Sequence, residues 1–119
     1  MAPHLLLVED STLVTDALRI LFEETGHRVT VAASVSQAVA SATADPPDLM
    51  LLDLTLPDGD GLAALRALSA NGLAPRATVA MTGHDDPATR QRCLDAGCRA
   101  VMVKPVPARE LLKRVREWL

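Results

Sequence analysis

The stretch Leu49-Met50-Leu51-Leu52-Asp53-Leu54-Thr55-Leu56-Pro57-Asp58-Gly59-Asp60-Gly61 decides the fold of this chain. Four apolar residues run directly into an acid, a pattern typical of a strand buried on both faces of a parallel sheet. Pro57 then prevents the sheet from continuing. Because open α/β sheets bind ligands beyond the carboxyl ends of their strands, Asp53 lies where a site is expected. A carboxylate there could bind a metal, take a proton or act as a nucleophile, or it could cap a helix or lie in solvent.

The composition is that of one domain with an aliphatic core. The chain has 119 residues, of which 49% are hydrophobic but only 2% aromatic, so the core must consist mainly of Leu, Val, Ala, Ile and Met. No apolar run approaches the roughly 18 residues of a membrane span, and the first residues lack the basic start of a signal peptide. We therefore expect a cytoplasmic protein without membrane contact. Cys93 and Cys98 are interpreted as small buried hydrophobes, because a metal site needs more ligands and a disulfide needs an oxidising compartment.

The charge is distributed unevenly along the sequence. Residues 1–60 carry two basic and ten acidic residues, whereas residues 61–119 carry ten basic and five acidic residues. The halves therefore have net charges of −8 and +5, which together give the −3 of the whole chain. This asymmetry indicates an acidic site in the first half and a basic face in the second. Direct nucleic-acid binding is disfavoured, because it usually requires a strongly basic domain with stacking aromatic residues.

Strand-like and helix-like segments alternate five times along the chain, in units of about 24 residues. Gly26, Pro46, Gly72 and Gly97 separate the segments, and Ser34 with Gln37 forms a capping box. This alternation predicts a parallel sheet with helices on both faces. The expected strands are 4–8, 28–32, 49–53, 77–81 and 100–103, and the expected helices are 12–25, 34–44, 60–72, 86–97 and 108–119.

The predicted strand ends deliver polar residues to one edge of the sheet. These are Glu9 and Asp10 after the first strand, Asp53 after the third, Thr82 after the fourth and Lys104 after the fifth. Three neighbouring carboxylates repel one another unless a cation neutralises them, and carboxylate oxygens suit Mg²⁺. A bound Mg²⁺ with open positions favours phosphate oxygens, for which Lys104 supplies positive charge and Thr82 a hydroxyl donor. Asp53 would be the nucleophile that accepts a phosphoryl group.

The whole chain resembles a receiver domain of the two-component response-regulator family. The matching motifs are Glu9-Asp10, Asp53-x-x-Leu56-Pro57-x-Gly59-x-Gly61, Thr82-Gly83 and Lys104-Pro105. The resemblance implies an α/β, flavodoxin-like (βα)5 three-layer sandwich with a five-stranded parallel sheet of order 2-1-3-4-5. It also implies a cis peptide between Lys104 and Pro105. The receiver would cover residues 1–119, and because the last predicted helix ends at Leu119 we expect no output domain in this chain.

The resemblance further implies a role for each site residue. Asp53 would be the phosphorylated aspartate and, with Asp10, a direct Mg²⁺ ligand. Glu9 would hold the metal through water and Thr55 through its backbone carbonyl. Thr82 and Lys104 would bind the phosphoryl oxygens. The expected phosphodonor is a sensor histidine kinase or a phosphotransfer protein, and the domain would be a monomer or a weak phosphorylation-dependent dimer.

A downstream protein target is expected to bind through residues 86–119. That segment carries most of the basic residues of the second half, so its partner should be acidic or mixed in charge, although a solvated face is the simpler interpretation. Apart from Lys104, which is assigned to the site, the basic residues of this segment are Arg90, Arg92, Arg99, Arg109, Lys113, Arg114 and Arg116.

Two positions depart from the family pattern. Val101 stands where receivers usually have Tyr or Phe, so the conformational switch is expected to work without a moving ring. His84, two residues after Thr82, lies where the family tunes loss of the phosphoryl group, but it could equally be an ordinary surface histidine.

Three other functions compete with this interpretation. Gly59-x-Gly61-x-x-Ala64 fits a dinucleotide fingerprint, but flanking acids would repel a pyrophosphate. The main alternative is a Mg²⁺-dependent phosphatase of haloacid-dehalogenase type, which also forms an aspartyl phosphate but normally has a second Asp where Thr55 stands. A non-phosphorylated interaction module would be expected to lack one of the acids or the lysine.

Overall fold

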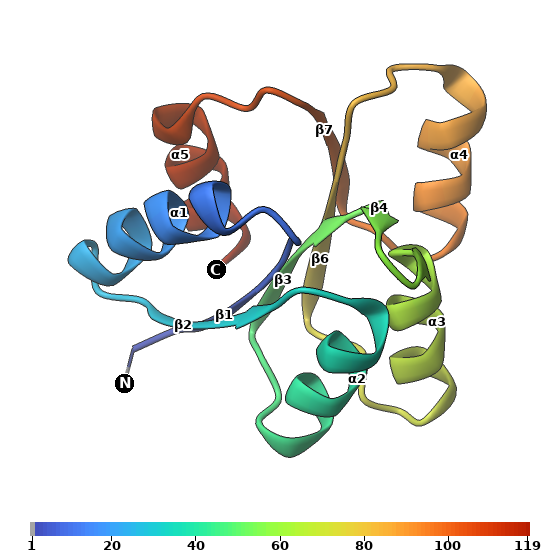
Figure 1. Cartoon of the computed structure of the whole chain (residues 1–119), viewed down its shortest axis with the longest axis horizontal. Helices are drawn as coiled ribbons and strands as arrows, with labels where there is room; N and C mark the ends of the chain where they lie inside the picture. The colour runs from blue at the N-terminus through green and yellow to red at the C-terminus, as the bar shows by residue number, and fades with distance from the viewer. Residues whose placement is uncertain (1) are drawn as a thin grey trace.

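Five parallel strands form the central sheet, in the order β2-β1-β3-β6-β7 (Figure 1). The computed structural model describes residues 2–119. The strands are β1 (His4–Val8), β2 (Arg28–Ala32), β3 (Leu49–Asp53), β6 (Ala77–Thr82) and β7 (Ala100–Val103). Numbered by their place among the strands of this sheet, they have the order 2-1-3-4-5, which confirms the prediction.

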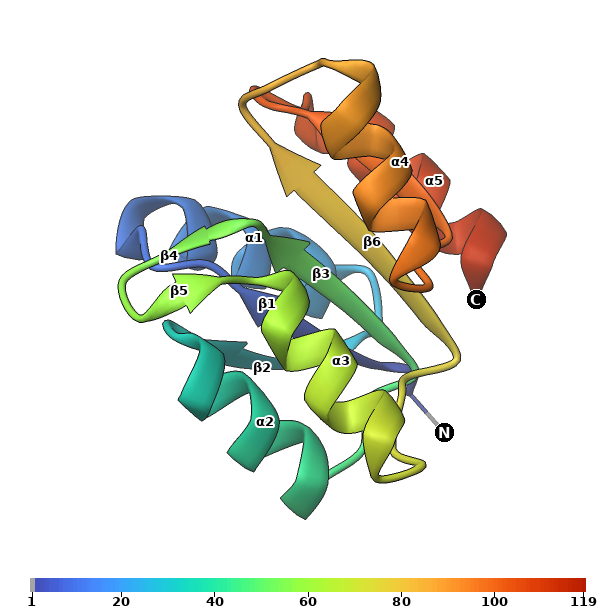
Figure 2. The same ribbon diagram turned by 90° about the vertical axis from the view of Figure 1, so that its right-hand side faces the viewer.

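Helices cover both faces of the sheet. On one face lie α1 (Thr12–Glu24) and α5 (Ala108–Trp118); on the other lie α2 (Val35–Ala44), α3 (Leu62–Ala70) and α4 (Pro87–Asp95) (Figures 1 and 2). The predicted helix starts and ends agree with these bounds to within about two residues. No helix within residues 2–119 has the length and apolar character needed to span a bilayer.

Alternate side chains of the inner strands enter two separate cores. Leu5 and Leu7 of β1 pack with Phe22 in the cluster beneath α1 and α5. Leu6 and Val8 pack instead in the cluster beneath α2 and α3. Every residue of β1 and β3 is buried, which explains why both strands have nearly continuous apolar sequences.

The predicted capping box at Ser34 forms, with one difference in detail. The Ser34 hydroxyl accepts a hydrogen bond from the Gln37 N–H at 3.2 Å, but the Gln37 side chain accepts from the Ala33 N–H and not from that of Ser34. Asp86 caps α4 by accepting from the Thr89 N–H at 2.8 Å, and Pro87 occupies the first turn.

A short hairpin between β3 and α3 was not predicted from the sequence. It pairs β4 (Thr55–Leu56) antiparallel with β5 (Gly59–Asp60), and Gly61 follows it directly. Gly59 therefore lies in a short antiparallel hairpin and not in the turn after a parallel strand, where a dinucleotide site would need it. The hairpin is connected to α2, because the Asp58 carboxylate accepts hydrogen bonds from the N–H groups of Val35 at 2.7 Å and Ser36 at 3.1 Å. These bonds lower the pKa of Asp58 below its ordinary value.

Candidate phosphoacceptor site

The carboxyl ends of four strands bring the predicted site residues together. Glu9 follows β1, Asp53 ends β3, Thr82 ends β6 and Lys104 follows β7. The peptide bond between Lys104 and Pro105 is cis, as the resemblance implied. These residues therefore lie together at one edge of the sheet, where the order of the predicted strand ends had put them.

Three carboxylates form the acidic part of the site. Glu9, Asp10 and Asp53 each offer an oxygen, and these oxygens all lie within 4.8 Å of one another. Glu9 and Asp53 are buried, whereas Asp10 is exposed. Hard carboxylate oxygens at this spacing, one of them open to solvent, match the donors and the open coordination that Mg²⁺ prefers. The residues present therefore fit a magnesium ion.

Lys104 bridges the two buried carboxylates. Its Nζ lies 2.9 Å from Glu9 Oε2 and 3.0 Å from Asp53 Oδ2. Burial opposes the charged form of the lysine, but these two carboxylates outweigh it and raise the pKa of Lys104. Burial, reinforced by the neighbouring Asp53, also raises the pKa of Glu9, although Lys104 acts in the opposite direction. The lysine is the cation that allows two acids to be buried side by side.

The remaining predicted residues surround Asp53 without all contacting it. The Thr55 backbone N–H donates to Asp53 Oδ1 at 3.2 Å, so the Thr55 backbone lies directly beside the Asp53 carboxylate. The Thr82 side chain is buried, and its hydroxyl accepts a hydrogen bond from the His84 N–H at 3.0 Å. Within residues 2–119 no hydrogen bond joins Thr82 to Asp53. Thr82 therefore lies beside the site with its own proton still available for donation.

Gly61 packs directly against the backbone of Asp53, a contact that the motif match did not reveal. Its N–H donates to the Leu54 carbonyl at 2.9 Å, and a Cβ added at residue 61 would lie 2.0 Å from the Asp53 carbonyl oxygen. The φ angle of Gly61 is −54°, which any residue adopts easily, so space and not backbone conformation requires glycine here. Asp53 is thereby held between the turn of the loop and the sheet.

A cavity of about 350 Å³ adjoins the site on the side of α4. His84 lines it and is exposed, so it belongs to the surroundings of the site as the sequence suggested. Arg92 also lines this cavity and forms an ion pair with Asp60, a contact that sequence reasoning missed because 32 residues separate the partners. Val101, in place of the usual aromatic residue, is half-buried and packs against the core beneath α2 and α3. The lining residues are Leu54, Thr55, Leu56, Gly59, Asp60, Thr82, His84, Thr89 and Arg92.

The sequence matches one protein family over nearly its whole length. Residues 5–116 match the family model described as the response regulator receiver domain. The chain is 34% identical over 119 residues to the TorCAD operon transcriptional regulatory protein TorR of Escherichia coli O157:H7. This match covers 100% of the present chain and 51% of TorR. It is 33% identical to the KDP operon transcriptional regulatory protein KdpE of Escherichia coli K12, over 95% of this chain and 49% of that protein. The chain thus spans about half the length of these curated relatives.

Solved structures of the same architecture superpose closely. A CheY-like response regulator receiver domain protein from Methanospirillum hungatei JF-1 superposes with a TM-score of 0.90 at 30% identity. The superposition covers 98% of the present chain and 93% of the Methanospirillum chain. The receiver domain of the sensor histidine kinase PA1611 from Pseudomonas aeruginosa PAO1 has a TM-score of 0.87 at 32% identity, over 99% of this chain and 98% of its own. That second structure has a magnesium ion coordinated in its active site cleft.

Proposed function

This chain belongs to the response regulator receiver family, and from that premise we propose that Asp53 accepts a phosphoryl group from a phosphohistidine in a Mg²⁺-dependent reaction. The observation that carries the proposal is the arrangement around Asp53, whose buried carboxylate pairs with Lys104 at 3.0 Å and lies within 4.8 Å of carboxylate oxygens of Glu9 and Asp10. A nucleophilic carboxylate, a cation for the transferred group and a metal-binding acidic cluster are the parts that phosphoryl transfer to an aspartate requires.

Different residues of the site have different roles in the transfer. Asp10, Asp53, the Thr55 carbonyl and, through water, Glu9 would hold Mg²⁺, which supplies positive charge to the phosphoryl oxygens when it is bound. A carboxylate oxygen of Asp53 attacks phosphorus while the bond between phosphorus and the donor imidazole nitrogen breaks. The other nitrogen of the phosphohistidine ring carries a proton, so the imidazole leaves as the neutral ring with the electron pair of the broken bond.

Two further side chains stabilise the transferred group. Lys104 exchanges its contact with Asp53 for a phosphoryl oxygen, and Thr82 donates its hydroxyl proton to another. The same groups would support the later hydrolysis that returns Asp53 to its free form, so we regard the domain as a phosphoacceptor that promotes its own phosphorylation and dephosphorylation.

A phosphatase of haloacid-dehalogenase type gains no support. Its second acid is missing, because residue 55 is a threonine that contacts Asp53 through its backbone N–H and has an exposed side chain. The family match places the chain among receivers instead.

The phosphodonor would dock on apolar surface next to the site. Leu13 of α1 has 82% of its surface exposed, and the neighbouring Val14 is also exposed. A largely apolar hollow of about 420 Å³ lies between Val14 and Lys104. Surface of this kind beside a phosphoacceptor suits a helical donor such as a histidine kinase or a phosphotransfer protein. The hollow is lined by Val14, Leu18, Met81, Lys104, Pro105, Val106 and Leu111.

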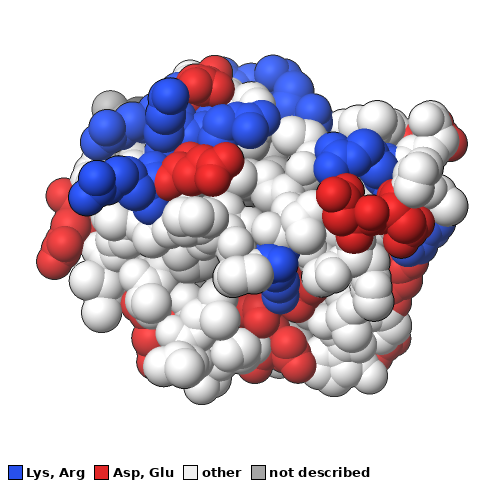
Figure 3. Space-filling model, turned by 90° about the horizontal axis from the view of Figure 1, so that it is seen from above, with Lys and Arg blue, Asp and Glu red and all other residues white. Residues whose placement is uncertain are grey.

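A downstream target would bind the basic face formed by residues 86–119. Figure 3 shows Lys and Arg side chains gathered on the side of the molecule where α5 lies. Part of this charge is neutralised internally, since Arg90 pairs with Asp85, Arg92 with Asp60 and Arg114 with Glu117. The other basic residues of this segment, in no ion pair within residues 2–119, are Arg99, Arg109, Lys113 and Arg116, and they favour an acidic or mixed partner.

Substitution of the acceptor tests the proposal. Asp53→Asn is nearly isosteric but has no nucleophilic carboxylate, so labelling by acetyl phosphate or by a phosphohistidine donor with Mg²⁺ should disappear. The circular dichroism spectrum should stay that of the wild type. Asp16→Asn removes an exposed acid on α1 with the same loss of charge and should label normally. Undiminished labelling of Asp53→Asn would place the acceptor elsewhere, first at Glu9 or Asp10. Steady release of phosphate from small phosphomonoesters would instead indicate a phosphatase.

A further inference from the structure

The ion pair between Asp60 and Arg92 connects the hairpin that follows Asp53 with helix α4. Asp60 uses its two oxygens differently: Oδ1 accepts a hydrogen bond from the Leu62 N–H at 2.9 Å, and Oδ2 pairs with the Arg92 guanidinium. The carboxylate therefore fixes the start of α3 and, at the same time, ties the hairpin that follows Asp53 to α4.

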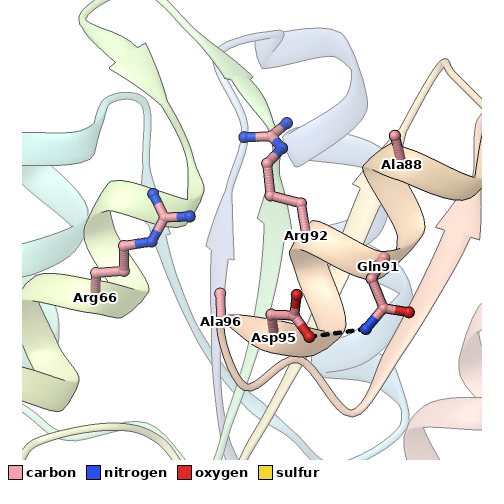
Figure 4. A pocket seen from close by; sticks show the side chains of 6 residues that line it. All are labelled: Arg66, Ala88, Gln91, Arg92, Asp95 and Ala96. Atoms are coloured by element: carbon pink, nitrogen blue, oxygen red, sulfur yellow. Dashed lines mark hydrogen bonds between the residues drawn. The ribbon is translucent and has the colours of Figure 1, made fainter.

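Little else attaches α4 to that hairpin. Of its nine residues only Cys93 is buried, and its remaining side-chain hydrogen bonds stay within α4 or reach the turn just before it, at Asp85 and Asp86. Among the hydrogen bonds and ion pairs of residues 2–119, the Arg92 contact is the one that joins an α4 side chain to the segment 54–61. Figure 4 shows Arg92 extending from α4 into the groove of about 530 Å³ that separates it from α3, with Arg66 facing it from α3.

The Asp60–Arg92 pair also lies next to the phosphoacceptor site. Asp60 and Arg92 line the cavity beside the site together with Thr55, the residue whose N–H contacts Asp53, and with Thr82. A phosphoryl group adds about −1.5 to −2 charges at this edge of the sheet. That new negative charge competes with Asp60 for the Arg92 guanidinium, so a change at Asp53 alters the force that holds α4.

We infer that Arg92 is a positioning residue that couples α4 to the phosphoacceptor loop through Asp60. The inference rests on the proposed function, because it names the contact by which phosphorylation of Asp53 reaches the face formed by residues 86–119. Some such contact is required, since a signal that does not change the energy of α4 cannot shift its position.

Matched substitutions on α4 test the coupling. Arg92→Gln removes the pair, Arg92→Lys retains the charge, and Arg90→Gln removes an equal charge whose partner, Asp85, lies in the turn before α4. Amide chemical shifts are measured with and without Mg²⁺ and beryllofluoride. In the wild type and in the Arg90→Gln and Arg92→Lys variants, beryllofluoride should change the amide shifts both around Asp53 and across residues 86–96. In Arg92→Gln the changes around Asp53 should persist while those across residues 86–96 fall at least two-fold. Equal changes across residues 86–96 in Arg92→Gln and Arg90→Gln would overturn the inference.

A second measurement separates this inference from the proposed function. Without any phosphate analogue, amide hydrogens of α4 should exchange about 1.4- to 5-fold faster in Arg92→Gln than in the wild type, the range expected for one exposed ion pair. Arg92→Lys should restore much of the protection. If beryllofluoride leaves the wild-type shifts unchanged, the proposed function fails, and the exchange rates still decide whether Arg92 positions α4. Identical α4 exchange in Arg92→Gln and the wild type would overturn the inference.

Discussion

Replacing Gly61 with alanine would place a methyl carbon 2.0 Å from the carbonyl oxygen of Asp53 and 3.0 Å from its carbonyl carbon. Non-bonded heavy atoms ordinarily lie about 3.5–4.0 Å apart, so the loop or the end of β3 must move. The atoms in the way belong to the backbone and not to a flexible side chain, and the Asp53 backbone is held in the sheet by pairing with β6. The substitution therefore tests whether the close approach at Gly61 holds the phosphoacceptor in place.

The expected cost follows from two opposing effects. In a backbone conformation that alanine tolerates, Gly→Ala alone stabilises a fold by about 0.4–1 kcal/mol through the unfolded chain. Forcing an extra carbon into a filled space costs about 1–3 kcal/mol and often more against rigid backbone. We expect Gly61→Ala to lower the free energy of unfolding by about 1–3 kcal/mol, because the steric clash outweighs the gain. Gly83→Ala is the control, since a Cβ there meets nothing within 4 Å.

Urea unfolding followed by the fluorescence of the single tryptophan, Trp118, measures the change in stability. Labelling by acetyl phosphate under native conditions measures the second effect. Because the clash involves the Asp53 backbone itself, Gly61→Ala should be labelled more slowly than Gly83→Ala even where both are fully folded. If Gly61→Ala unfolds at the wild-type urea concentration and is labelled at the wild-type rate, the close approach does not position Asp53 and this reasoning is refuted.

Two further predictions concern the interior. The Thr78 hydroxyl is buried without a hydrogen-bond partner within residues 2–119, so Thr78→Val should raise the free energy of unfolding by about 1 kcal/mol. Thr30→Val should lower it, because the Thr30 hydroxyl lies 2.8 Å from His4 Nε2. If the urea midpoints of both variants moved in the same direction, this prediction would be contradicted. Burial raises the pKa of Cys98 to about 12 and also raises that of Cys93, and a thiol reacts as its thiolate, so iodoacetamide at pH 8 should modify neither until urea unfolds the protein. Mass spectrometry after timed alkylation measures this, and rapid modification of the native protein would show that the thiols are accessible.

The layout of the fold could be predicted from the sequence because each unit has its own local signals. The apolar run before Asp53 has no polar residue to face solvent and is followed closely by a proline, a pattern that indicates a short strand covered on both sides. Gly72 and Pro87 mark where neighbouring elements end or begin. The acidic and basic site residues were located by the same logic, since strand ends in a parallel sheet share one edge. The sheet order itself came from the family resemblance.

What could not be predicted depends on contacts between distant residues. The β4–β5 hairpin has two-residue strands, too short for any periodicity to indicate. The bond from Asp58 to the start of α2 spans 23 residues, and the space that excludes a side chain at Gly61 exists only once the loop has folded onto β3. The pairing of Lys104 with Glu9 spans 95 residues, and no local pattern specifies it.

The unequal burial of strands and helices has an evolutionary consequence. Every position of β1 and β3 is buried, so substitutions there are constrained by both cores and, at the strand ends, by the chemistry. On α4 only Cys93 is buried, and on α5 only Leu111 and Val115 are. Most positions of these two helices can therefore change without disturbing either core. A lineage carrying this domain can alter which proteins it recognises through α4 and α5 while inheriting the phosphoacceptor apparatus unchanged, so that duplicated copies can diverge in partner before they diverge in reaction.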